Sequence, residues 1–455
     1  MQILVFNTGS ASLKFQLTDS VGTETRTLLH GEVAPLGENA QLTWRHHDQQ
    51  GETHRRPVSA PDPAAAARAV LALLPLEPDV TAHRIVHGGR ELDRTTRIND
   101  NVLAAIKAHA PLAPLHNPPA LEVIDACLAR FPEAPAYAAF DTAWFHDLPP
   151  AARDYALPPG WSDHGPLRRY GFHGIAHRQL AGAVQANSGP TPTTPDSGPT
   201  PAWPNAGPTP VSRIITLQLG GGCSMAAVRD GRPVETSMGF TPLEGLLMAT
   251  RAGDVDAGLI AWLLTHTGLD AHELERGLYR ESGLLALSGV SGDMRRLLAL
   301  EADGHAGAQR AIESFCHRAR KYLGAYAAVL DGVDAIAFGG GIGQHAPSIR
   351  ARICDGLAWC GVEIDDTLNA DPDLPPGSDR PRSDPGSAGS GAQLRSDPGS
   401  DPGVVGVGPR CISAPASTAS IWVVPVDEAS AIAADVAALL SADAPTRPTT
   451  RSPLQ

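Results

Sequence analysis

Short apolar runs that end in glycine-rich turns recur along the chain and predict β-strands. The first run, residues 3–7, enters the turn Thr8-Gly9-Ser10 and is followed by an alternating run, so a hairpin is expected at the N-terminus. The same pattern returns at residues 213–219, which run into Gly220-Gly221-Gly222. In chain order, the expected strands are residues 3–7, 12–17, 83–87, 136–140, 213–219, 224–229, 232–236, 335–338 and 420–424.

Longer segments with helical spacing of apolar residues separate these strands. The expected helices are residues 64–74, 100–109, 255–265, 271–279, 306–330 and 428–440. A strand hairpin followed by helices and strands therefore occurs twice, which predicts two α/β halves of similar plan with a cleft between them. No apolar run approaches the length of a membrane span, and the N-terminus carries no basic leader.

Two segments account for an excess of glycine and proline, which number 46 and 41. Residues 187–211 repeat the string SGPTP, and residues 371–409 repeat RSDPGS. Both lack the apolar content that offsets ordering entropy, so we expect flexible insertions at these places. The tail, residues 443–455, is expected to be disordered.

Charge and cysteine content narrow the function further. The formal net charge of −13 argues against nucleic-acid binding through an extended basic surface, but it is compatible with a local basic pocket for a small anion. Six cysteines without a CxxC pair indicate reduced thiols in a cytoplasmic protein. They are Cys127, Cys223, Cys316, Cys354, Cys360 and Cys411.

Three strand-to-glycine turns are candidates for phosphate binding, because glycine lets backbone N–H groups approach an anion. They begin at Asn7, Leu219 and Phe338. A hairpin needs glycine in any case, so one such turn would be weak evidence. The third turn also matches the dinucleotide fingerprint G-x-G-x-x-A from Gly341, with Glu363 about twenty residues on, but it follows no clear βαβ pattern. The Walker pattern is absent.

Several polar residues are candidates for a site, each with a plainer alternative. Arg84 and Arg251 carry guanidinium forks that suit carboxylate or phosphate, although a structural salt bridge would also explain them. His116 and His173 are candidates for catalysis or for a satisfied core histidine. Asp141, at the end of a strand, is a candidate site residue or a turn cap.

Longer strings resemble the acetate kinase family over the whole chain apart from the insertions and tail. In order, they are NTGSASLKFQL, HRIVHGG, LAPLHNPPALEVI, FDTAW, RRYGFHG, VETSMGFTPLEGLLMATRAGD, LSGVSGDMR and GIGQHAPSIR. The resemblance implies two ribonuclease-H-like (actin-like ATPase) domains with an active-site cleft between them. It assigns residues 1–145 and 429–442 to the first domain and 146–428 to the second. It further implies a homodimer and phosphoryl transfer from ATP to acetate that depends on Mg²⁺, or on Mn²⁺ in its place. The net charge and the lack of a long apolar run predict no nucleic-acid or membrane partner.

The resemblance also assigns roles to individual residues. It implies catalytic roles for Asp141, His173 and Arg251, and metal binding by Asn7 and Glu428. Substrate contacts would come from Arg84, His116, Val86, Leu115, Phe172 and Pro242. Nucleotide and phosphate contacts would come from Ser10, Ser12, Lys14, Gln218, Leu219, Gly220, Gly221, Gly222, Asp293, Met294, Arg295, Gly341, Ile342, Gly343, Gln344 and His345. Because acetate is already ionised at neutral pH, we expect Asp141 to orient Arg84 or Mg²⁺ rather than to act as a base.

Three departures from the family pattern lie on the nucleotide side. The usual HLGNG is Gln218-Leu219-Gly220-Gly221-Gly222, the usual GIGEN is GIGQH, and GFHGTSH has become GFHGIAH, with Ile175 and Ala176 in place of two hydroxyl residues. Two alternatives therefore remain. One is a propionate or butyrate kinase, and the other is a weakly active nucleotide-binding regulator on the same fold.

Overall fold

A computed structural model describes residues 1–9, 12–21, 24–47, 52–74, 77–188, 211–370 and 408–443. Apart from their end residues, the expected insertions and tail lie outside these described ranges, as does Ser10. The chain forms two compact units, one from residues 1–146 together with the chain from Asp427 on, and one from Asp147–Val426. In the described ranges, no helix combines the length and apolar character that a membrane span requires.

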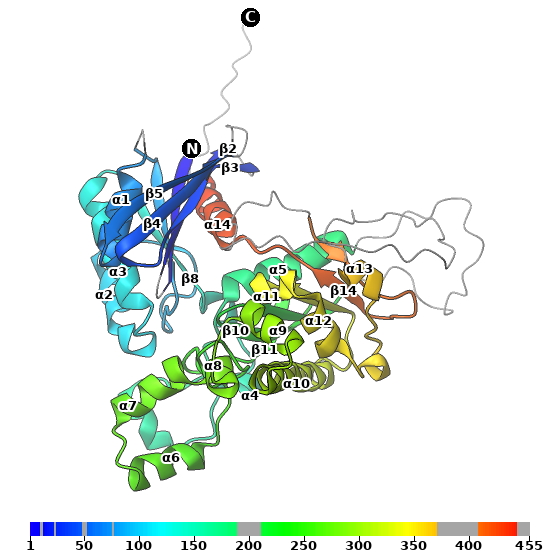
Figure 1. Cartoon of the computed structure of the whole chain (residues 1–455). Coiled ribbons are helices and arrows are strands. Elements are labelled where there is room, and N and C mark those ends of the chain that lie inside the picture. Colours follow the sequence, from blue (N-terminus) through cyan, green and yellow to red (C-terminus); the bar gives the residue numbers. More distant parts are fainter. Residues whose placement is uncertain are drawn as a thin grey trace, which may run out of the picture. The chain divides into compact units, whose positions relative to one another are not determined.

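The first unit is built on an eight-stranded sheet with the order β5-β4-β3-β2-β1-β6-β8-β7 (Figure 1). Strands β1 to β5 are antiparallel neighbours, whereas β1, β6 and β8 run parallel. The strands are β1 (Gln2–Thr8), β2 (Leu13–Val21), β3 (Glu24–Ala34), β4 (Gly37–His46), β5 (Thr53–Ala60), β6 (Val80–Ile85), β7 (Thr96–Arg97) and β8 (Ala136–Phe140). The helices are α1 (Pro63–Leu71), α2 (Asp100–Ala108), α3 (Asn117–Arg130) and α14 (Glu428–Asp443), with short 3-10 turns at Ala110–Leu112 and Ala143–Phe145.

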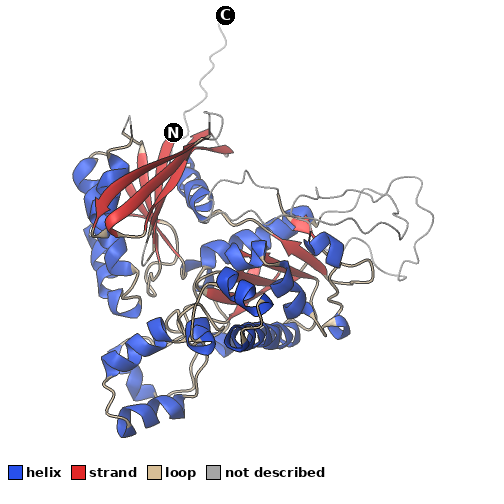
Figure 2. Ribbon diagram, viewed as in Figure 1, coloured by secondary structure: helices blue, strands red, loops and turns tan. Residues whose placement is uncertain are grey.

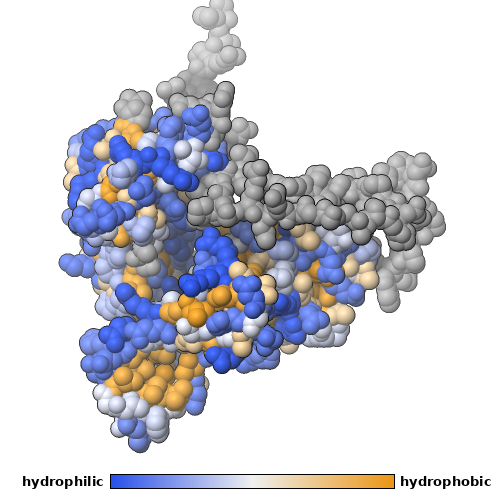
Figure 3. Space-filling view, viewed as in Figure 1, coloured by the Kyte–Doolittle hydropathy of each residue, from blue (hydrophilic) through white to orange (hydrophobic). Residues whose placement is uncertain are grey.

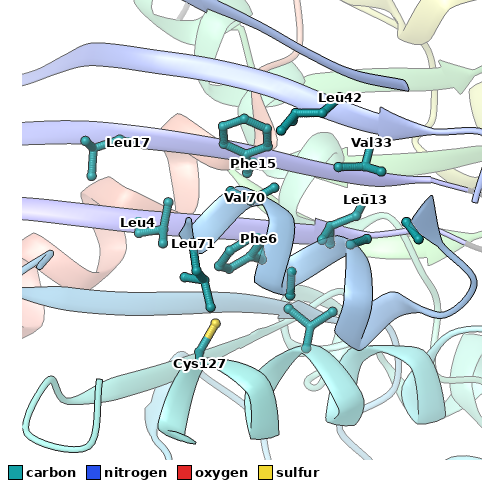
Figure 4. Close-up of a cluster of buried hydrophobic side chains, with 14 of the residues drawn as sticks. Leu4, Phe6, Leu13, Phe15, Leu17, Val33, Leu42, Val70, Leu71 and Cys127 are labelled. Atoms are coloured by element: carbon teal, nitrogen blue, oxygen red, sulfur yellow. The ribbon is translucent and has the colours of Figure 1, made fainter. Parts of the chain in front are cut away.

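Alternation of side chains gives this sheet its buried core. Leu4 and Phe6 of β1 and Phe15 of β2 point to the face covered by α1 and α3, where they meet Val70 and Cys127 (Figure 4). Asp62 caps α1 by accepting a hydrogen bond from the backbone N–H of Ala65, which fixes where that helix begins. Helix α14 packs on β1, β2 and β3, so the C-terminal helix joins the N-terminal sheet.

The second unit has a six-stranded sheet with the order β11-β10-β9-β12-β14-β13. Its strands are β9 (Arg213–Leu219), β10 (Cys223–Arg229), β11 (Arg232–Thr236), β12 (Ala335–Gly339), β13 (Arg410–Cys411) and β14 (Ser420–Val423). Helix α5 packs on β9 and β12, and α10 packs on β9 and β10 from the other face (Figure 2).

The helices of the second unit are α4 (Pro150–Arg153), α5 (Gly174–Asn187), α6 (Ala257–His266), α7 (Ala271–Arg276), α8 (Gly283–Ser288), α9 (Met294–Ala302), α10 (Ala306–Val329), α11 (Gly340–His345), α12 (Pro347–Cys354) and α13 (Asp366–Ala370). Short 3-10 helices occupy Pro159–His164 and Ala358–Cys360, and a π turn occupies Gly277–Glu281.

The two sheets share one plan. In each, an antiparallel hairpin and a third antiparallel strand lead to two parallel strands, in the order β3-β2-β1-β6-β8 and β11-β10-β9-β12-β14. The prediction of two α/β halves of similar plan is confirmed.

Several sequence-based expectations about elements were wrong or incomplete, and the 14-residue helices α3 and α5 were not expected. The strand expected at residues 83–87 is Val80–Ile85, because the N–H and C=O of His87 pair with the side chain of Asn117 instead of with a strand. Strands β3, β4 and β5 were not expected. The Gly341 motif was expected to follow no clear βαβ pattern. In the structure, α11, which contains the motif, begins directly after β12, and the later strand β14 runs parallel to β12.

Candidate active site

Parallel strands bring the polar residues of the first unit to one edge of its sheet. Asn7 at the end of β1 is paired with Arg84 on β6. Asp141 directly follows β8, and its backbone N–H donates to the carbonyl of Ile85. Glu428 opens α14, which packs on β1. Four residues that are far apart in the sequence therefore form one cluster, which we call the Arg84 cluster: Asn7, Arg84, Asp141 and Glu428.

Arg84 is the centre of this cluster. Its Nε donates to Oδ1 of Asp141 at 3.0 Å, and its Nη2 forms a second bond to the same carboxylate. Nη1 donates to Oδ1 of Asn7 at 3.0 Å, and Oε2 of Glu428 lies 3.2 Å from Nε. Burial opposes the charge of Arg84, but attraction to Asp141 and Glu428 outweighs this effect and raises its pKa. The guanidinium is therefore a fixed, permanently charged group that is 11% exposed.

The donor atoms of the cluster fit a magnesium ion. Asn7 and Glu428 are themselves in contact, with Nδ2 of Asn7 donating to Oε2 of Glu428 at 2.7 Å. They offer an amide oxygen and a carboxylate, and one guanidinium faces two carboxylates, so the cluster keeps a net negative charge. Among the described residues, no group of three or more His, Cys, Asp or Glu side chains is placed to hold a metal. Mg²⁺ takes few protein oxygens and keeps its waters and phosphate ligands, so the amide oxygen of Asn7 and the carboxylate of Glu428 are donors of the kind that it accepts.

The β1–β2 hairpin lies beside this cluster. The N–H of Gly9 donates to the carbonyl of Ser12 at 2.9 Å, and Lys14 is exposed on β2 directly opposite Asn7. The turn therefore places one lysine and a tight backbone loop near the Arg84 cluster.

Two glycine turns meet in the second unit, at the ends of the parallel strands β9 and β12. The β9–β10 turn is closed by Gly220 N–H donating to the carbonyl of Gly222 at 3.1 Å. Gly340 opens α11 with φ +73°, and a Cβ there would lie 2.4 Å from the carbonyl oxygen of Leu219. Only glycine permits this approach, so the Gly220–Gly222 turn and the start of α11 form one surface.

The residues expected to contact the nucleotide differ in their exposure to solvent. Leu219, Gly343 and Met294 are buried, whereas Gly221, Gly341 and His345 are exposed. The half-buried positions are Gln218, Gly220, Gly222, Ile342 and Gln344.

The Asp293–Arg295 segment adjoins the same surface. Asp293 caps α9 and pairs with Arg295 at 2.7 Å. The preceding Gly292 packs against the backbone of Ala249, whose N–H donates to the carbonyl of Gly221 at 3.1 Å. The backbone of Ala249 thus links the start of α9 to the triple-glycine turn.

His173 and Arg251 flank this turn. A Cβ on Gly222 would lie 3.5 Å from Nε2 of His173 and 3.8 Å from Nη1 of Arg251. Arg251 also donates from Nη1 to the carbonyl of Pro242 at 3.0 Å. His173 has φ +58°, a left-handed conformation that is costly for a residue with a Cβ and that often marks a functional position.

The expected acyl-contact residues divide between the units. Val86, Leu115 and His116 belong to the first unit, where His116 directly precedes α3. Phe172, which precedes His173, and Pro242, which accepts from Arg251, belong to the second and are buried.

Sequence reasoning missed three polar residues behind His173. Ser224 on β10, His177 on α5 and Thr216 on β9 are fully buried and hydrogen-bonded to one another. The spacing of His173 and His177 by four residues was the signal in the sequence that placed them on one helical face.

Comparisons with known proteins cover both units. A family model described as the acetokinase family matches residues 2–189 and 206–378. An acetate kinase from Clavibacter michiganensis is 41% identical over 375 residues, which cover 81% of this chain and 89% of the relative.

Two solved structures resemble the whole chain. An acetate kinase from Porphyromonas gingivalis has a TM-score of 0.76 and 30% identity, covering 96% of this chain and 99% of its own. A propionate kinase from Francisella tularensis has a TM-score of 0.77 and 29% identity, covering 95% and 98%. The two-domain α/β fold class expected from the sequence is confirmed.

Proposed function

The chain belongs to the acetokinase family, as its motifs predicted, and we propose that it transfers the γ-phosphoryl group of ATP to acetate, reversibly forming acetyl phosphate and ADP. The observation that carries this proposal beyond family membership is the Arg84 cluster, in which a guanidinium with little exposure is held near the ends of the parallel strands β1, β6 and β8. Carboxylates and phosphates are the groups that a guanidinium binds best, because they can accept two parallel hydrogen bonds from it.

The main obstacle in this reaction is repulsion between two anions. Acetate is ionised at neutral pH, so its oxygen attacks phosphorus without losing a proton, and no general base is required. Asp141 instead fixes the guanidinium of Arg84, which supports the orienting role expected for it. Arg84 then attracts the anionic reactants and spreads the charge of the transferred group.

The second unit supplies the donor side of the proposal. Backbone N–H groups of the Gly220–Gly222 turn and of the α11 start suit phosphate oxygens. Asp293–Arg295 and Gly341–His345 are the segments that we propose to contact the nucleotide. His173 and Arg251, which flank Gly222, are proposed to stabilise the equatorial oxygens as the phosphoryl group moves.

Magnesium is proposed as the metal, held by Asn7 and Glu428 of the Arg84 cluster. When bound, the ion neutralises phosphate charge and fixes the phosphate chain. The oxygen donors and the net negative charge of the cluster support this assignment.

A homodimer is proposed through helix α6. The helix buries none of its residues, and it exposes 46% of Leu259, 52% of Trp262 and 41% of Leu264. Figure 3 shows an apolar patch in the region of α6. The ten residues of α6 include no Lys, Arg, Asp or Glu, and charge depletion is typical of the centre of a homodimer interface. The compartment proposed is the cytoplasm, which the six free cysteines support.

The acyl acceptor and the phosphoryl donor are tested together. The similarity to a solved propionate kinase favours testing propionate beside acetate. The experiment traps the acyl phosphate with hydroxylamine, using purified protein, Mg²⁺, each of acetate, propionate and butyrate, and each of ATP, GTP and pyrophosphate.

The expected result is acetyl hydroxamate with ATP, lost in Arg251→Ala. Product from propionate or butyrate at a higher kcat/KM than from acetate would reassign the acceptor. Nucleotide binding without any acyl phosphate would contradict the enzyme proposal and favour a nucleotide-binding regulator.

A further inference from the structure

A buried chain of hydrogen bonds lies behind His173. Nδ1 of His173 is 2.8 Å from Oγ of Ser224, and the same oxygen is 2.7 Å from Nε2 of His177. Nδ1 of His177 is in turn 2.7 Å from Oγ1 of Thr216. All three bonds are within the normal range for groups of this kind. Ser224, His177 and Thr216 are 0% exposed.

The fold explains why these groups meet. Thr216 on β9 and Ser224 on β10 lie on one face of the hairpin, because Ser224 is paired with Gln218, two residues beyond Thr216. That face is covered by α5, and His173 and His177 lie one helical turn apart at its N-terminal end.

The number of available protons leaves two possible sets of donors and acceptors in this hydrogen-bond chain. Burial lowers the pKa of His177 to about 3, so its ring is neutral and carries one N–H. Ser224 has one hydroxyl proton but stands between two ring nitrogens, so it donates to one ring and accepts from the other. The tautomers of His173 and His177 are therefore locked together.

The distances favour one of the two arrangements. If His173 donates from Nδ1, the hydroxyl of Thr216 has to donate to the carbonyl of Ala226, which is 3.5 Å away and at the limit of a hydrogen bond. If Thr216 instead donates to Nδ1 of His177, Nε2 of His177 donates to Ser224 and Ser224 donates to Nδ1 of His173, so every proton lies in a bond of 2.7–2.8 Å. In this arrangement the neutral ring of His173 carries its proton on Nε2, the atom near Gly222 and Arg251.

We propose that Ser224 and His177 are positioning residues that hold His173 as the Nε2–H tautomer, so that a neutral ring donates a hydrogen bond to the transferred phosphoryl group. This proposal rests on the role of His173 in the proposed function. A neutral donor next to Arg251 avoids placing a second positive charge beside the guanidinium. The left-handed backbone at His173 is consistent with a ring held in one orientation by its contacts.

The kinetic test compares three serine variants. Ser224→Ala removes the hydroxyl that joins the two rings, and the expected result is a kcat lowered roughly 10- to 100-fold, with the KM for acetate and ATP little changed. Ser224→Thr restores the hydroxyl and should recover most of the loss. Ser237→Ala is the matched control, because Ser237 is equally buried and its Oγ accepts a hydrogen bond from the backbone N–H of Met225, not from a histidine ring of the described residues. Its kcat should stay within about two-fold of the parent enzyme.

The spectroscopic test measures the tautomer directly. Full-length protein with ¹⁵N-labelled histidine is recorded with ADP and Mg²⁺, and the resonance of His173 is assigned from the spectrum of His173→Gln. The proposal predicts a protonated Nε2 and an unprotonated Nδ1 in the parent protein, and a loss of this single tautomer in Ser224→Ala.

A protonated Nδ1 in the parent protein, or an identical tautomer in Ser224→Ala, would overturn the proposal. An unchanged kcat in a folded Ser224→Ala would overturn it as well. Because the tautomer is read without turnover, absence of acetyl phosphate formation in the parent protein would count against the proposed function alone.

Discussion

The replacement Asp141→Asn tests the view that Asp141 holds Arg84 and does not accept a proton. In the structure, Asp141 is 1% exposed and forms two bonds to the guanidinium, one of them Nε to Oδ1 at 3.0 Å. Asparagine keeps the shape and one oxygen, but its amide nitrogen cannot accept from Nη2 of Arg84. The variant therefore loses one charge-assisted bond and leaves the guanidinium less firmly oriented.

The magnitude follows from that lost bond. A hydrogen bond between charged groups is worth about 1.5–3 kcal/mol. At about 1.36 kcal/mol for each factor of ten, kcat/KM for acetate should fall roughly 10- to 150-fold. The matched variant is Glu428→Gln, since Glu428 is 15% exposed and also faces Nε of Arg84, at 3.2 Å. It should show a smaller loss, together with a higher requirement for Mg²⁺.

The assay measures initial rates against acetate across the neutral pH range, with thermal unfolding as the check on folding. The account predicts a pH profile of the same shape in Asp141→Asn and in the parent enzyme. If Asp141 acted as a base, the acid limb of the profile would disappear with the carboxylate, and the loss of kcat would exceed this range by far. That outcome would refute the orienting role.

Three further predictions concern stability and assembly. Gly340→Ala places a Cβ 2.4 Å from a carbonyl oxygen at φ +73°, so it should lower the free energy of unfolding by more than about 1 kcal/mol and weaken ADP binding. Gly277→Ala is the control, because a Cβ there lies in open space on a helical backbone and should change neither quantity. Urea unfolding measures the stability, and calorimetry measures the binding of ADP. Burial lowers the pKa of His83 and of His177 from 6.5 to about 3, so the unfolded chain binds more protons between these values, and stability should fall by up to about 2.7 kcal/mol per pH unit as the pH drops from 6.5. His83→Phe should halve the dependence of stability on pH. It should also raise the free energy of unfolding by about 1–2 kcal/mol at neutral pH, because both ring nitrogens of His83 are buried without a hydrogen-bond partner. Urea unfolding at several pH values measures both effects, and an unchanged pH dependence would contradict the reasoning. Trp262→Glu should convert a dimer to a monomer in light scattering, and a monomeric parent protein would contradict the proposed interface.

The sequence allowed the prediction of several elements with a strongly apolar face, but not of helices α3 and α5, which also bury one apolar face. The β1–β2 and β9–β10 hairpins were found because buried residues alternate or run continuously up to a glycine turn. Strands β4 and β5 were missed because they bury few residues, and β5 exposes most of its side chains. A pattern of hydrophobic alternation cannot indicate such strands, which are held by the neighbouring ladder.

The candidate site was predictable in its parts but not in its contacts. Arg84 and Asp141 were named from motifs, and their pairing depends on the register of β6 and β8, which places residues 57 positions apart side by side. Ser224 and His177 carried no catalytic signal by themselves. Their role emerges only when α5 covers the β9–β10 hairpin, a packing that periodicity does not specify.

The most direct test of the central claim follows the phosphorus atoms themselves. Purified protein, Mg²⁺, ATP and acetate are monitored by ³¹P NMR, with acetate omitted in a parallel sample. The account predicts that acetyl phosphate and ADP appear in equal amounts, only when acetate is present. ADP formed together with inorganic phosphate, at the same rate with and without acetate, would contradict it.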